Sequence, residues 1–598
     1  MNDHCAGHAP PDPSLSPGTR DSYVVTALSD IVDRSLHAAL ARFTLGLSPA
    51  AVSAAYLDWL VHLMAAPGKR LQLLDKMIRK AMRFSAYAWQ EAMQPGTAPP
   101  VIEPLPQDHR FAADGWQHLP FNLFYQGFLL QQQWWHNATS DIRGVTRHHD
   151  DIVNFGGRQL LDMFSPSNFL ATNPELLQRT FQTGGRNFAL GLQHLLEDWE
   201  RAVSGKKPVG SKAYRIGLDV AASPGKVVFR NRLIELIQYA PATDRVHSEP
   251  ILIVPAWIMK YYILDLSAHN SLVRYLTDQG FTVFMISWKN PDAEDRDLGM
   301  EDYRRLGVMA ALDAIATIAP QRQVHALGYC LGGTLLAIAS AAMARDGDTR
   351  LRTVTLLAAQ TDFTEAGELM LFIDESQIAF LEDMMWEQGF LDAKQMAGAF
   401  QMLRSNDLVW SLVLRRYLMG EREPLSDMMA WNADATRLPY RMHSEYLRRL
   451  FLDNDLAEGR YLAGDRPIAL TDIRVPVFAV GTAWDHVAPW RSTYKIHLLV
   501  DTEVTYVLTN GGHNAGIVSE IDKPGRHHQF MTKAAEKRYV DPETWAAITP
   551  RRDGSWWPTY GAWLRSHSGD LTTPPAMGND AAGLSPLCDA PGTYVLQD

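Results

Sequence analysis

One short stretch constrains the fold of this chain more than any other. Residues 324–333 read Val-His-Ala-Leu-Gly-Tyr-Cys-Leu-Gly-Gly, and small and apolar residues follow as far as Ala344. This order predicts a buried strand, a sharp turn that carries Cys330, and a helix. Gly328 and Gly332 flank the cysteine, because a side chain at either position would collide in so tight a reversal. The sequence therefore predicts that Cys330 stands at the carboxyl end of a strand, where the positive end of a helix dipole favours its thiolate.

Two other interpretations of this stretch compete with the first. Residues 326–344 carry no charge, as a membrane helix would, but the glycines and the Tyr-Cys turn in the first half favour a strand followed by a helix. Cys330 alone could also be a small core residue, since free cysteine is among the most buried residue types. Partners elsewhere in the chain decide between these interpretations.

Two polar residues follow apolar strands later in the chain. Asp485 comes just after the apolar residues 476–480, and His513 just after the β-branched and aromatic residues 504–508. A nucleophile, an acid and a histidine in this order, each past a strand end, are typical of the α/β-hydrolase fold. The sequence thus predicts a catalytic triad of Cys330, Asp485 and His513.

Strands and helices alternate from about residue 215, which predicts a largely parallel sheet. The strands are expected at 227–229, 251–254, 282–286, 323–327, 353–357, 476–480 and 504–508. Residues 362–450 are mostly helical in pattern and aromatic, and we expect this insertion to cap Cys330 and shield an acyl-thioester from water. The predicted class is α/β, an α/β-hydrolase fold with a helical cap, preceded by a mainly helical N-terminal domain.

Composition divides the chain into four regions. Residues 1–20 contain four prolines and no apolar block, so we expect a disordered leader and no secretory signal. Apolar residues at helical spacing predict a mainly helical domain over 21–210, and the catalytic domain follows over 211–565. Residues 566–598, rich in Pro, Gly and Asp, are expected to form an extended tail.

Charge and motifs exclude several classes of protein. The net charge of −11 leaves no basic excess to neutralise nucleic-acid phosphates. Three cysteines far apart in 598 residues predict no disulfide framework and a reducing cytoplasm. Adjacent side chains in His148–Asp151 point apart on a helix and cannot all hold one metal ion. We find no zinc-ligand spacing and no phosphate-binding glycine loop, so neither a metal ion nor another cofactor is predicted. No transmembrane segment is predicted either, because the uncharged residues 326–344 are expected to form a strand and a helix.

Several further motifs carry a family resemblance over roughly residues 115–565. They are Ser165–Pro174, Phe229–Asn231, Glu235–Tyr239, Lys260–Leu266, Ser287–Asp292, Gly328–Gly333, Trp431–Asp434, Asp485–His486 and Gly512–Gly516. With these residues the chain resembles the polyhydroxyalkanoate synthases, in particular the single-subunit class that prefers short acyl chains. It departs from the family's usual pattern at Pro255-Ala256 and at Met259-Lys260, in a loop that shapes the site.

The resemblance implies that the chain polymerises 3-hydroxyacyl-CoA, with 3-hydroxybutyryl-CoA as the expected substrate, and releases CoA. Cys330 would hold the acyl group as a thioester while the N–H of Leu331 and the loop with Ala256 and Trp257 hold the oxyanion. Asp485 would either orient His513 or help to deprotonate the attacking hydroxyl, and the neighbouring His486 would tune it. The implied partners are the growing polyester, the surface of cytoplasmic polyester granules and a second copy of the chain in a homodimer.

Two other functions stay open at this stage. A cysteine thioesterase or polyester hydrolase would use the same triad in an open, wetted site. A non-catalytic protein that binds granules would not need a nucleophile, an acid and a histidine in this chain order. The preferred acyl chain length does not follow from the sequence.

Overall fold

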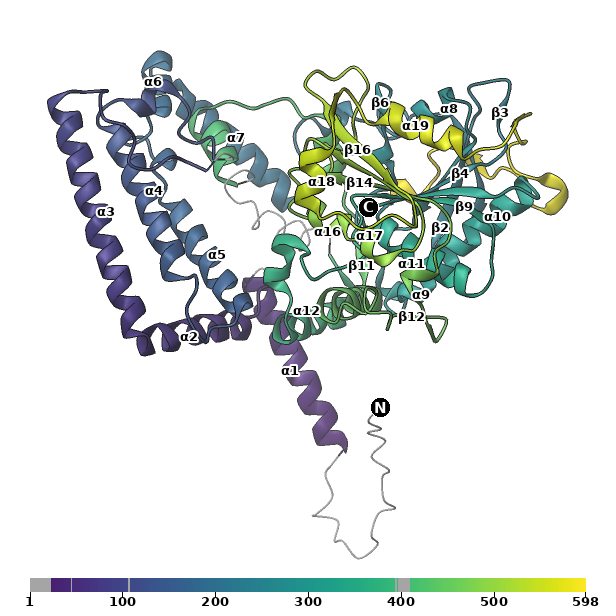
Figure 1. Ribbon diagram of the computed structural model, residues 1–598, viewed down its shortest axis with the longest axis horizontal. Coiled ribbons are helices and arrows are strands. Elements are labelled where there is room, and N and C mark those ends of the chain that lie inside the picture. The colour runs from purple at the N-terminus through teal and green to yellow at the C-terminus, as the bar shows by residue number, and fades with distance from the viewer. Residues whose placement is uncertain (1–22, 45, 106–107, 393–394, 396–408, 598) are drawn as a thin grey trace, which may run out of the picture.

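The computed structural model describes residues 23–44, 46–105, 108–392, 395 and 409–597. The leader expected over residues 1–20 lies outside this described part of the chain. Figure 1 shows two parts side by side: a helical N-terminal part and, beside it, a part built around a sheet.

An eleven-stranded sheet is the centre of the second part, in the order β17-β16-β15-β14-β9-β8-β4-β7-β2-β1-β19. The six neighbours from β15 to β7 are parallel, and the strands outside them pair antiparallel at both edges. The strands are β1 (Gly225–Arg230), β2 (Ile234–Tyr239), β4 (Ile251–Val254), β7 (Val283–Trp288), β8 (Val324–Tyr329), β9 (Leu351–Leu357), β14 (Val477–Thr482), β15 (Val504–Thr509), β16 (His527–Lys533), β17 (Arg551–Asp553) and β19 (Cys588–Asp589).

Each strand segment expected from the sequence overlaps a strand of this sheet, and the largely parallel arrangement is confirmed. The antiparallel edge strands β2, β16, β17 and β19 were not anticipated. In β2, Glu235 and Gln238 are buried, so the strand lacks the apolar alternation that marks a half-buried strand. A polar residue that is paired inside the fold looks, in the sequence, like a residue of a loop.

Helices cover both faces of the sheet, as parallel strands require. They are α8 (Leu272–Asp278), α10 (Ala310–Ile318), α11 (Leu331–Arg345), α16 (Trp490–Tyr494), α17 (Ile496–Leu499), α18 (Pro542–Ile548) and α19 (Trp557–Ser566). Helix α11 is buried from Leu331 to Met343, which explains its uncharged sequence without a membrane. Within the described ranges, no helix is both long and apolar enough to cross a bilayer.

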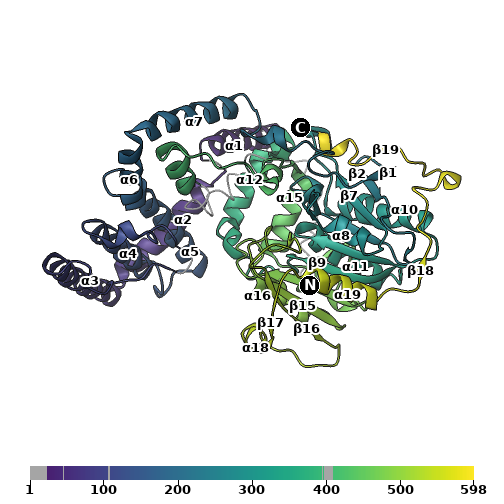
Figure 2. The same ribbon diagram turned by 90° about the horizontal axis from the view of Figure 1, so that it is seen from above.

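The helical N-terminal part is confirmed, and it touches the region between β9 and β14 at several places, of which those of α1 and α7 are the most extensive. Helix α1 packs along α12 (Glu375–Gln388), where His37 Nδ1 lies 2.7 Å from Asp383 Oδ2. Helix α7 packs against the π-helical turn Val413–Leu418, and Arg422 next to it bonds Asp198 at 2.9 Å (Figure 2). The N-terminal helices are α1 (Tyr23–Phe43), α2 (Pro49–Ala65), α3 (Pro67–Met93), α4 (Phe121–Ala138), α5 (Arg147–Met163), α6 (Pro174–Thr183) and α7 (Arg186–Val203).

The segment between β9 and β14 is mainly helical, with α12, α14 (Asp427–Asn432), α15 (Tyr440–Tyr446) and the π-helical turn Leu447–Leu452. It is tied to the loop after β4, because Trp431 Nε1 donates to the Lys260 carbonyl at 2.8 Å and Tyr262 donates to Asp434 at 2.9 Å. The chain then ends with a segment that returns to the sheet edge, where β19 pairs with β1.

Candidate active site

Cys330 lies in the turn between β8 and α11, with a backbone φ of 53° and ψ of −124°. A Cβ built on Gly328 would meet the Gly333 Cα at 2.4 Å, and one on Gly332 would meet the Val254 carbonyl oxygen at 2.1 Å. Real side chains do not tolerate such contacts, so the glycines are required by the close approach of backbone segments. The turn expected from the Gly-x-Cys-x-Gly spacing is therefore present, and it holds the sulfur side chain at the sheet's carboxyl edge.

The structure brings Asp485 and His513 together beside this turn, each just past the end of its parallel strand. His513 Nδ1 lies 2.8 Å from Asp485 Oδ2. The same carboxylate accepts hydrogen bonds from the Thr482 hydroxyl at 3.0 Å and from the backbone N–H groups of Val487 and Ala488 at 2.9 and 2.8 Å. The side chain of Asp485 is fully buried, so these four donors fix both its charge and its orientation.

The electrostatics couple the three residues. Burial lowers the pKa of His513, but the Asp485 carboxylate and the Cys330 sulfur outweigh burial and raise this pKa well above its usual value. Burial raises the pKa of Asp485, and the charge of His513 with the hydrogen bonds it receives lowers it overall. His513 therefore holds a proton readily between an anionic carboxylate and the cysteine sulfur, which is the environment that favours a thiolate nucleophile.

A neighbouring pair fixes the histidine loop to the strand that carries Cys330. The Tyr329 hydroxyl donates to Asn514 Oδ1 at 2.5 Å, and the Tyr329 and His513 rings lie 5.7 Å apart. Burial raises the pKa of Tyr329 well above its usual value, so the hydroxyl stays a hydrogen-bond donor. Asn514 follows His513 directly, and its bond limits the freedom of the histidine.

The residues expected around an oxyanion lie next to the sulfur. Leu331 is the first residue of α11, and Trp257 lines the same cavity as Cys330, with Ala256 buried beside it. Among the described residues, the backbone N–H groups of Leu331, Ala256 and Trp257 have no backbone acceptor outside the regular elements. The N–H of Leu331 at the start of α11 and the N–H groups of Ala256 and Trp257 in the loop after β4 are therefore candidates to bind a developing negative charge. His486 is half-buried, and it is not among the residues that line the cavity.

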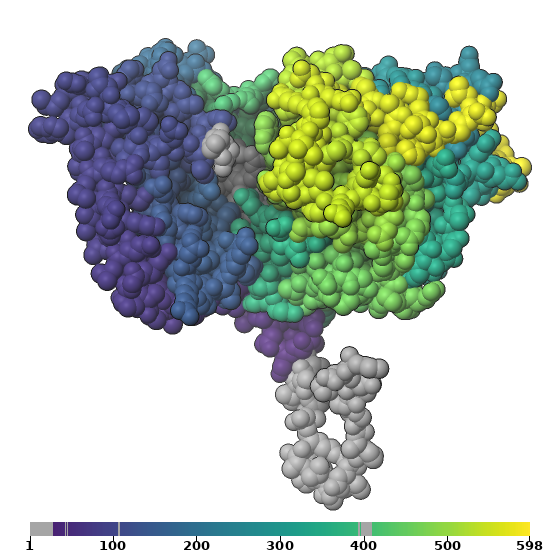
Figure 3. Space-filling model, viewed as in Figure 1, coloured from purple at the N-terminus to yellow at the C-terminus, as the bar shows by residue number. Residues whose placement is uncertain are grey.

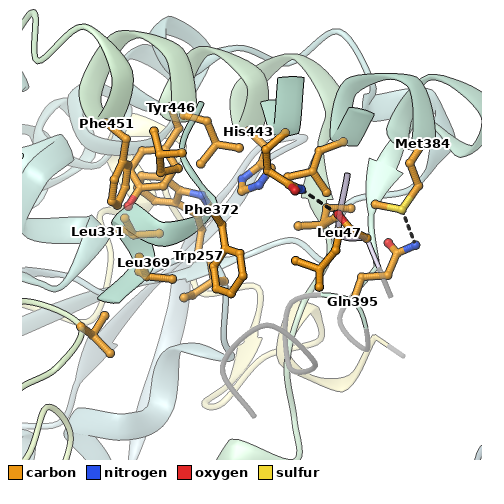
Figure 4. Close-up of a pocket in the computed structure, with 18 of the residues that line it drawn as sticks. Leu47, Trp257, Leu331, Leu369, Phe372, Met384, Gln395, His443, Tyr446 and Phe451 are labelled. Carbon is orange, nitrogen blue, oxygen red and sulfur yellow. Dashed lines mark hydrogen bonds between the residues drawn. The ribbon is translucent and has the colours of Figure 1, made fainter. Parts of the chain in front are cut away.

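A cavity of about 130 Å³ opens beside Cys330 (Figure 4). Its wall is almost entirely apolar, and most of it comes from the segment between β9 and β14. These residues are Leu369, Phe372, Ile373, Gln377, Leu381, Met384, Leu391, Gln395, His443, Tyr446, Leu447 and Phe451. The site thus combines a candidate nucleophile with a largely apolar cavity, which suits an acyl group that must be kept from water.

Part of the wall comes from a segment that the sequence did not point to. Gly46 and Leu47, between α1 and α2, line the cavity. Gln377 holds them, because its side chain accepts from the Ser48 N–H at 2.8 Å and donates to the Gly46 carbonyl at 2.7 Å. No motif marks these residues, since their role depends on a contact across more than three hundred residues of chain.

Comparison with known protein families gives three matches. Residues 107–276 match the family described as the N-terminus of poly-beta-hydroxybutyrate polymerase (PhaC), and residues 27–69 match a second N-terminal family of the same polymerase. Residues 249–520 match the alpha/beta hydrolase fold, the segment that contains all three residues of the predicted triad. The fold class expected from the sequence is confirmed.

Similar whole proteins agree with these matches. The poly(3-hydroxyalkanoate) polymerase of Methylorubrum extorquens is 43% identical over 536 residues, which is 88% of this chain and 87% of that one. The poly(3-hydroxyalkanoate) polymerase subunit PhaC of Rhizobium etli is 37% identical over 85% of this chain and 81% of its own. The subunit PhaC of Cupriavidus necator is 36% identical over 90% of each chain. The chain therefore belongs to the poly-beta-hydroxybutyrate polymerase family, the polyhydroxyalkanoate synthases that its motifs resemble.

Proposed function

We propose that this protein is an acyltransferase that polymerises 3-hydroxyacyl-CoA into a polyhydroxyalkanoate and releases CoA. The observation that carries the proposal is the position of Cys330, beside the hydrogen-bonded pair His513–Asp485 and at the wall of an apolar cavity. Family membership supports the reaction, and the site supports the way in which this chain performs it. The substrate is the CoA thioester itself, and the chemistry requires no further cofactor.

The first step forms an acyl-enzyme. His513 takes the thiol proton, and the Cys330 sulfur attacks the thioester carbonyl of the substrate. Backbone N–H groups of Leu331 and of the loop at Ala256 and Trp257 bind the oxyanion. The carbon–sulfur bond to CoA breaks, and CoA leaves as a thiol after it receives the proton from His513. One thioester replaces another, so the acyl group stays activated on the enzyme.

The second step lengthens the chain. The 3-hydroxyl of another hydroxyacyl unit attacks the thioester carbonyl on Cys330 and forms an oxyester. The carbon–sulfur bond to Cys330 breaks, and the hydroxyl proton passes through His513 to the Cys330 sulfur, which returns to a thiol. This step is downhill, because an oxyester is more stable than a thioester. Asp485 acts either by orienting His513 or by assisting removal of the hydroxyl proton, and its contact with His513 Nδ1 supports the first of these roles.

The size of the cavity supports a short-chain substrate, and we propose 3-hydroxybutyryl-CoA. About 130 Å³ is a small volume for an acyl chain, and large side chains such as Leu47, Phe372 and Leu381 close it. We also propose that the protein works in the cytoplasm on the surface of polyester granules, as a homodimer. The N-terminal helices form one side of the molecule (Figure 3). Exposed apolar side chains on them support contact with an apolar surface, among them Leu71, Trp89, Phe181 and Trp199.

The test uses the purified protein with 3-hydroxybutyryl-CoA and longer homologues. Free CoA and insoluble polyester are measured together, for the wild type, for Cys330→Ala and for Cys588→Ala. Cys588 is a matched control, since it is a half-buried free thiol in the C-terminal segment. Wild type and Cys588→Ala should release CoA and form polymer, whereas Cys330→Ala should retain less than about a thousandth of the rate.

A hydrolase with the same triad predicts a different product. It would release free 3-hydroxy acid with each CoA and leave no polymer. Release of monomeric acid in amounts equal to CoA would therefore contradict the polymerase function and support the thioesterase function.

A further inference from the structure

His443 is a polar residue in an otherwise apolar chamber. It lies on α15, is only 4% exposed and lines the cavity that contains Cys330 (Figure 4). Trp257, which lines the same cavity, also has an indole N–H without a partner, whereas the two glutamines on the wall are already bonded. Gln377 bonds the segment at Gly46 and Ser48, and Gln395 accepts from the Asp392 N–H at 2.9 Å.

No hydrogen bond joins a ring nitrogen of His443 to another group in the part of the chain that the structure describes. These nitrogens are not among the fully enclosed unpaired atoms, and the ring lines the cavity. Buried polar groups are nearly always paired, and an unpaired one in apolar surroundings is costly. His497 also has unpaired nitrogens, but its ring packs 4.5 Å from Tyr494 and does not line the cavity. His443 is thus an unpaired imidazole that faces a space large enough for a ligand.

The protonation state of His443 limits what it can bind. Burial lowers the pKa of His443 to about 4, so the ring is neutral at physiological pH. A neutral imidazole offers one N–H donor and one nitrogen acceptor. It does not attract a phosphate or a carboxylate by charge, but it pairs well with a hydroxyl or an ester carbonyl.

The position of His443 relates it to the nucleophile. Tyr446 follows one helical turn later, and the two rings lie 6.2 Å apart. Side chains three residues apart on a helix are neighbours on one face. His443, Tyr446 and Cys330 all line one cavity, so an acyl chain carried on Cys330 in this cavity would meet the His443 side chain.

We propose that His443 is a specificity-determining residue, which binds an oxygen atom of the acyl chain carried on Cys330. The inference rests on the proposed polymerase function. The oxygen is either the 3-hydroxyl of the bound unit or the ester carbonyl of the unit next to it. A plain fatty acyl chain has neither group and would leave the imidazole unpaired, so His443 selects hydroxyacyl and polyester chains over hydrocarbon chains.

The test compares wild type, His443→Gln and His443→Phe. Glutamine keeps a donor and an acceptor, whereas phenylalanine keeps only the ring shape. With 3-hydroxybutyryl-CoA, or with the CoA thioester of its dimer if the ester carbonyl is the group bound, His443→Phe should lose about tenfold in kcat/KM, the effect of one hydrogen bond. His443→Gln should lose less than about threefold. Inhibition by butyryl-CoA, which lacks the 3-oxygen, should be the same for all three proteins.

A second substrate locates the oxygen. The CoA thioester of the hydroxybutyrate dimer carries an internal ester carbonyl. A loss already seen with the monomer assigns His443 to the 3-hydroxyl, and a loss confined to the dimer assigns it to the ester carbonyl.

Three outcomes would count against the proposal. If His443→Phe weakens butyryl-CoA and 3-hydroxybutyryl-CoA equally, His443 only shapes the wall and the inference is wrong. Thermal unfolding of each variant monitors the fold, and His443→Met replaces His443→Phe in the same comparison if the latter does not fold. If the wild type makes polymer but the variants do not differ from it in how they distinguish 3-hydroxybutyryl-CoA from butyryl-CoA, this inference alone is overturned. A wild type that makes no polymer overturns the proposed function as well.

Discussion

The backbone of Cys330 has a conformation that few residues other than glycine adopt. A φ of 53° belongs to the left-handed region, which costs a non-glycine residue of order 1 kcal/mol or more. The surrounding structure holds this conformation, because the Cys330 N–H donates to the Leu357 carbonyl at 2.9 Å and its own carbonyl accepts from the Gly333 N–H at 2.9 Å. The strained turn keeps the side chain apart from both the strand and the helix.

Replacement of this sulfur by oxygen should separate acylation from polymerisation. Cys330→Ser would form an oxyester, and passing the acyl group to another hydroxyl would then exchange one oxyester for another. The pKa of a serine hydroxyl is also several units higher than the pKa of a thiol, which is about 8.5, so serine forms the anionic nucleophile less readily. We expect slow CoA release and little or no long polymer, measured by thiol titration and by the chain length of the product. Polyester of wild-type length at a comparable rate would contradict this account of the sulfur.

The pair His513–Asp485 should leave a pH signature on stability. A histidine whose folded pKa is raised stabilises the fold fully below its unfolded pKa of 6.5, and this stability is lost as pH rises through the folded pKa. The lowered pKa of Asp485 acts in the opposite sense, since its contribution is present above 3.8 and is lost as pH falls. The thermal midpoint of wild type should therefore exceed that of His513→Gln most between about pH 4 and 6.5.

The control for this experiment is His527→Gln. His527 lies at the start of β16 and is only half-buried, far along the chain from the triad's carboxylate. A midpoint difference for His513→Gln that does not depend on pH would show that the histidine stabilises by packing alone.

At the scale of elements, the sequence predicted those parts whose signals are local. The turn at Cys330, the seven strand segments and the chain order of the proposed triad all follow from short patterns, because glycine spacing and apolar runs report on the immediate backbone. Contacts between distant elements have no such signal. Neither the bond of Gln377 to Gly46 nor the place of His443 in the cavity can be read from neighbouring residues.

The loop between α1 and α2 gives a prediction about acyl chain length. Leu47→Ala shortens a side chain on the cavity wall and opens room for roughly two more carbon atoms of substrate. Each buried CH₂ contributes about 0.8 kcal/mol, so the preference for 3-hydroxyhexanoyl-CoA relative to 3-hydroxybutyryl-CoA should rise about tenfold. The ratio of kcat/KM values for the two substrates measures this. Leu57→Ala is the matched control, because Leu57 lies on α2 and is 56% exposed. An unchanged ratio in Leu47→Ala would place the acyl chain elsewhere.

At the scale of the whole molecule, the last residues close the sheet edge over a buried charge. The side chain of Glu235 is fully buried in β2, where Arg230 pairs with it at 2.6 Å. Its carboxylate also accepts from the backbone N–H groups of Thr593 and Tyr594, each at 2.9 Å, and from the Thr593 hydroxyl at 2.8 Å. The composition of this segment suggested only an extended chain, and its partners lie more than three hundred residues away.

Truncation after Leu587 should destabilise the catalytic part. It removes β19 and three hydrogen-bond donors of Glu235, and losing donors to a buried charge costs about 2–4 kcal/mol. A lower thermal midpoint and faster hydrogen exchange in β1 and β2 are the expected results. Thr593→Val removes only the hydroxyl donor, so its effect should be about 1 kcal/mol. Equal thermal midpoints for the truncated and the full-length protein would mean that water replaces the hydrogen bonds of this segment to Glu235 without loss of stability.

The small cavity has a consequence for the product. A cavity of about 130 Å³ has room for a short acyl group only, so in the proposed mechanism a growing polymer has to leave the cavity while its end stays on Cys330. Most of the wall is built from the catalytic part itself, but one portion, Gly46 and Leu47, is supplied from outside and fastened by two hydrogen bonds of Gln377. That portion lies outside the sheet, the loops of Asp485 and His513 and the loop at Ala256 and Trp257. The N-terminal part therefore shapes the space open to the acyl chain without supplying any of the proposed reacting groups.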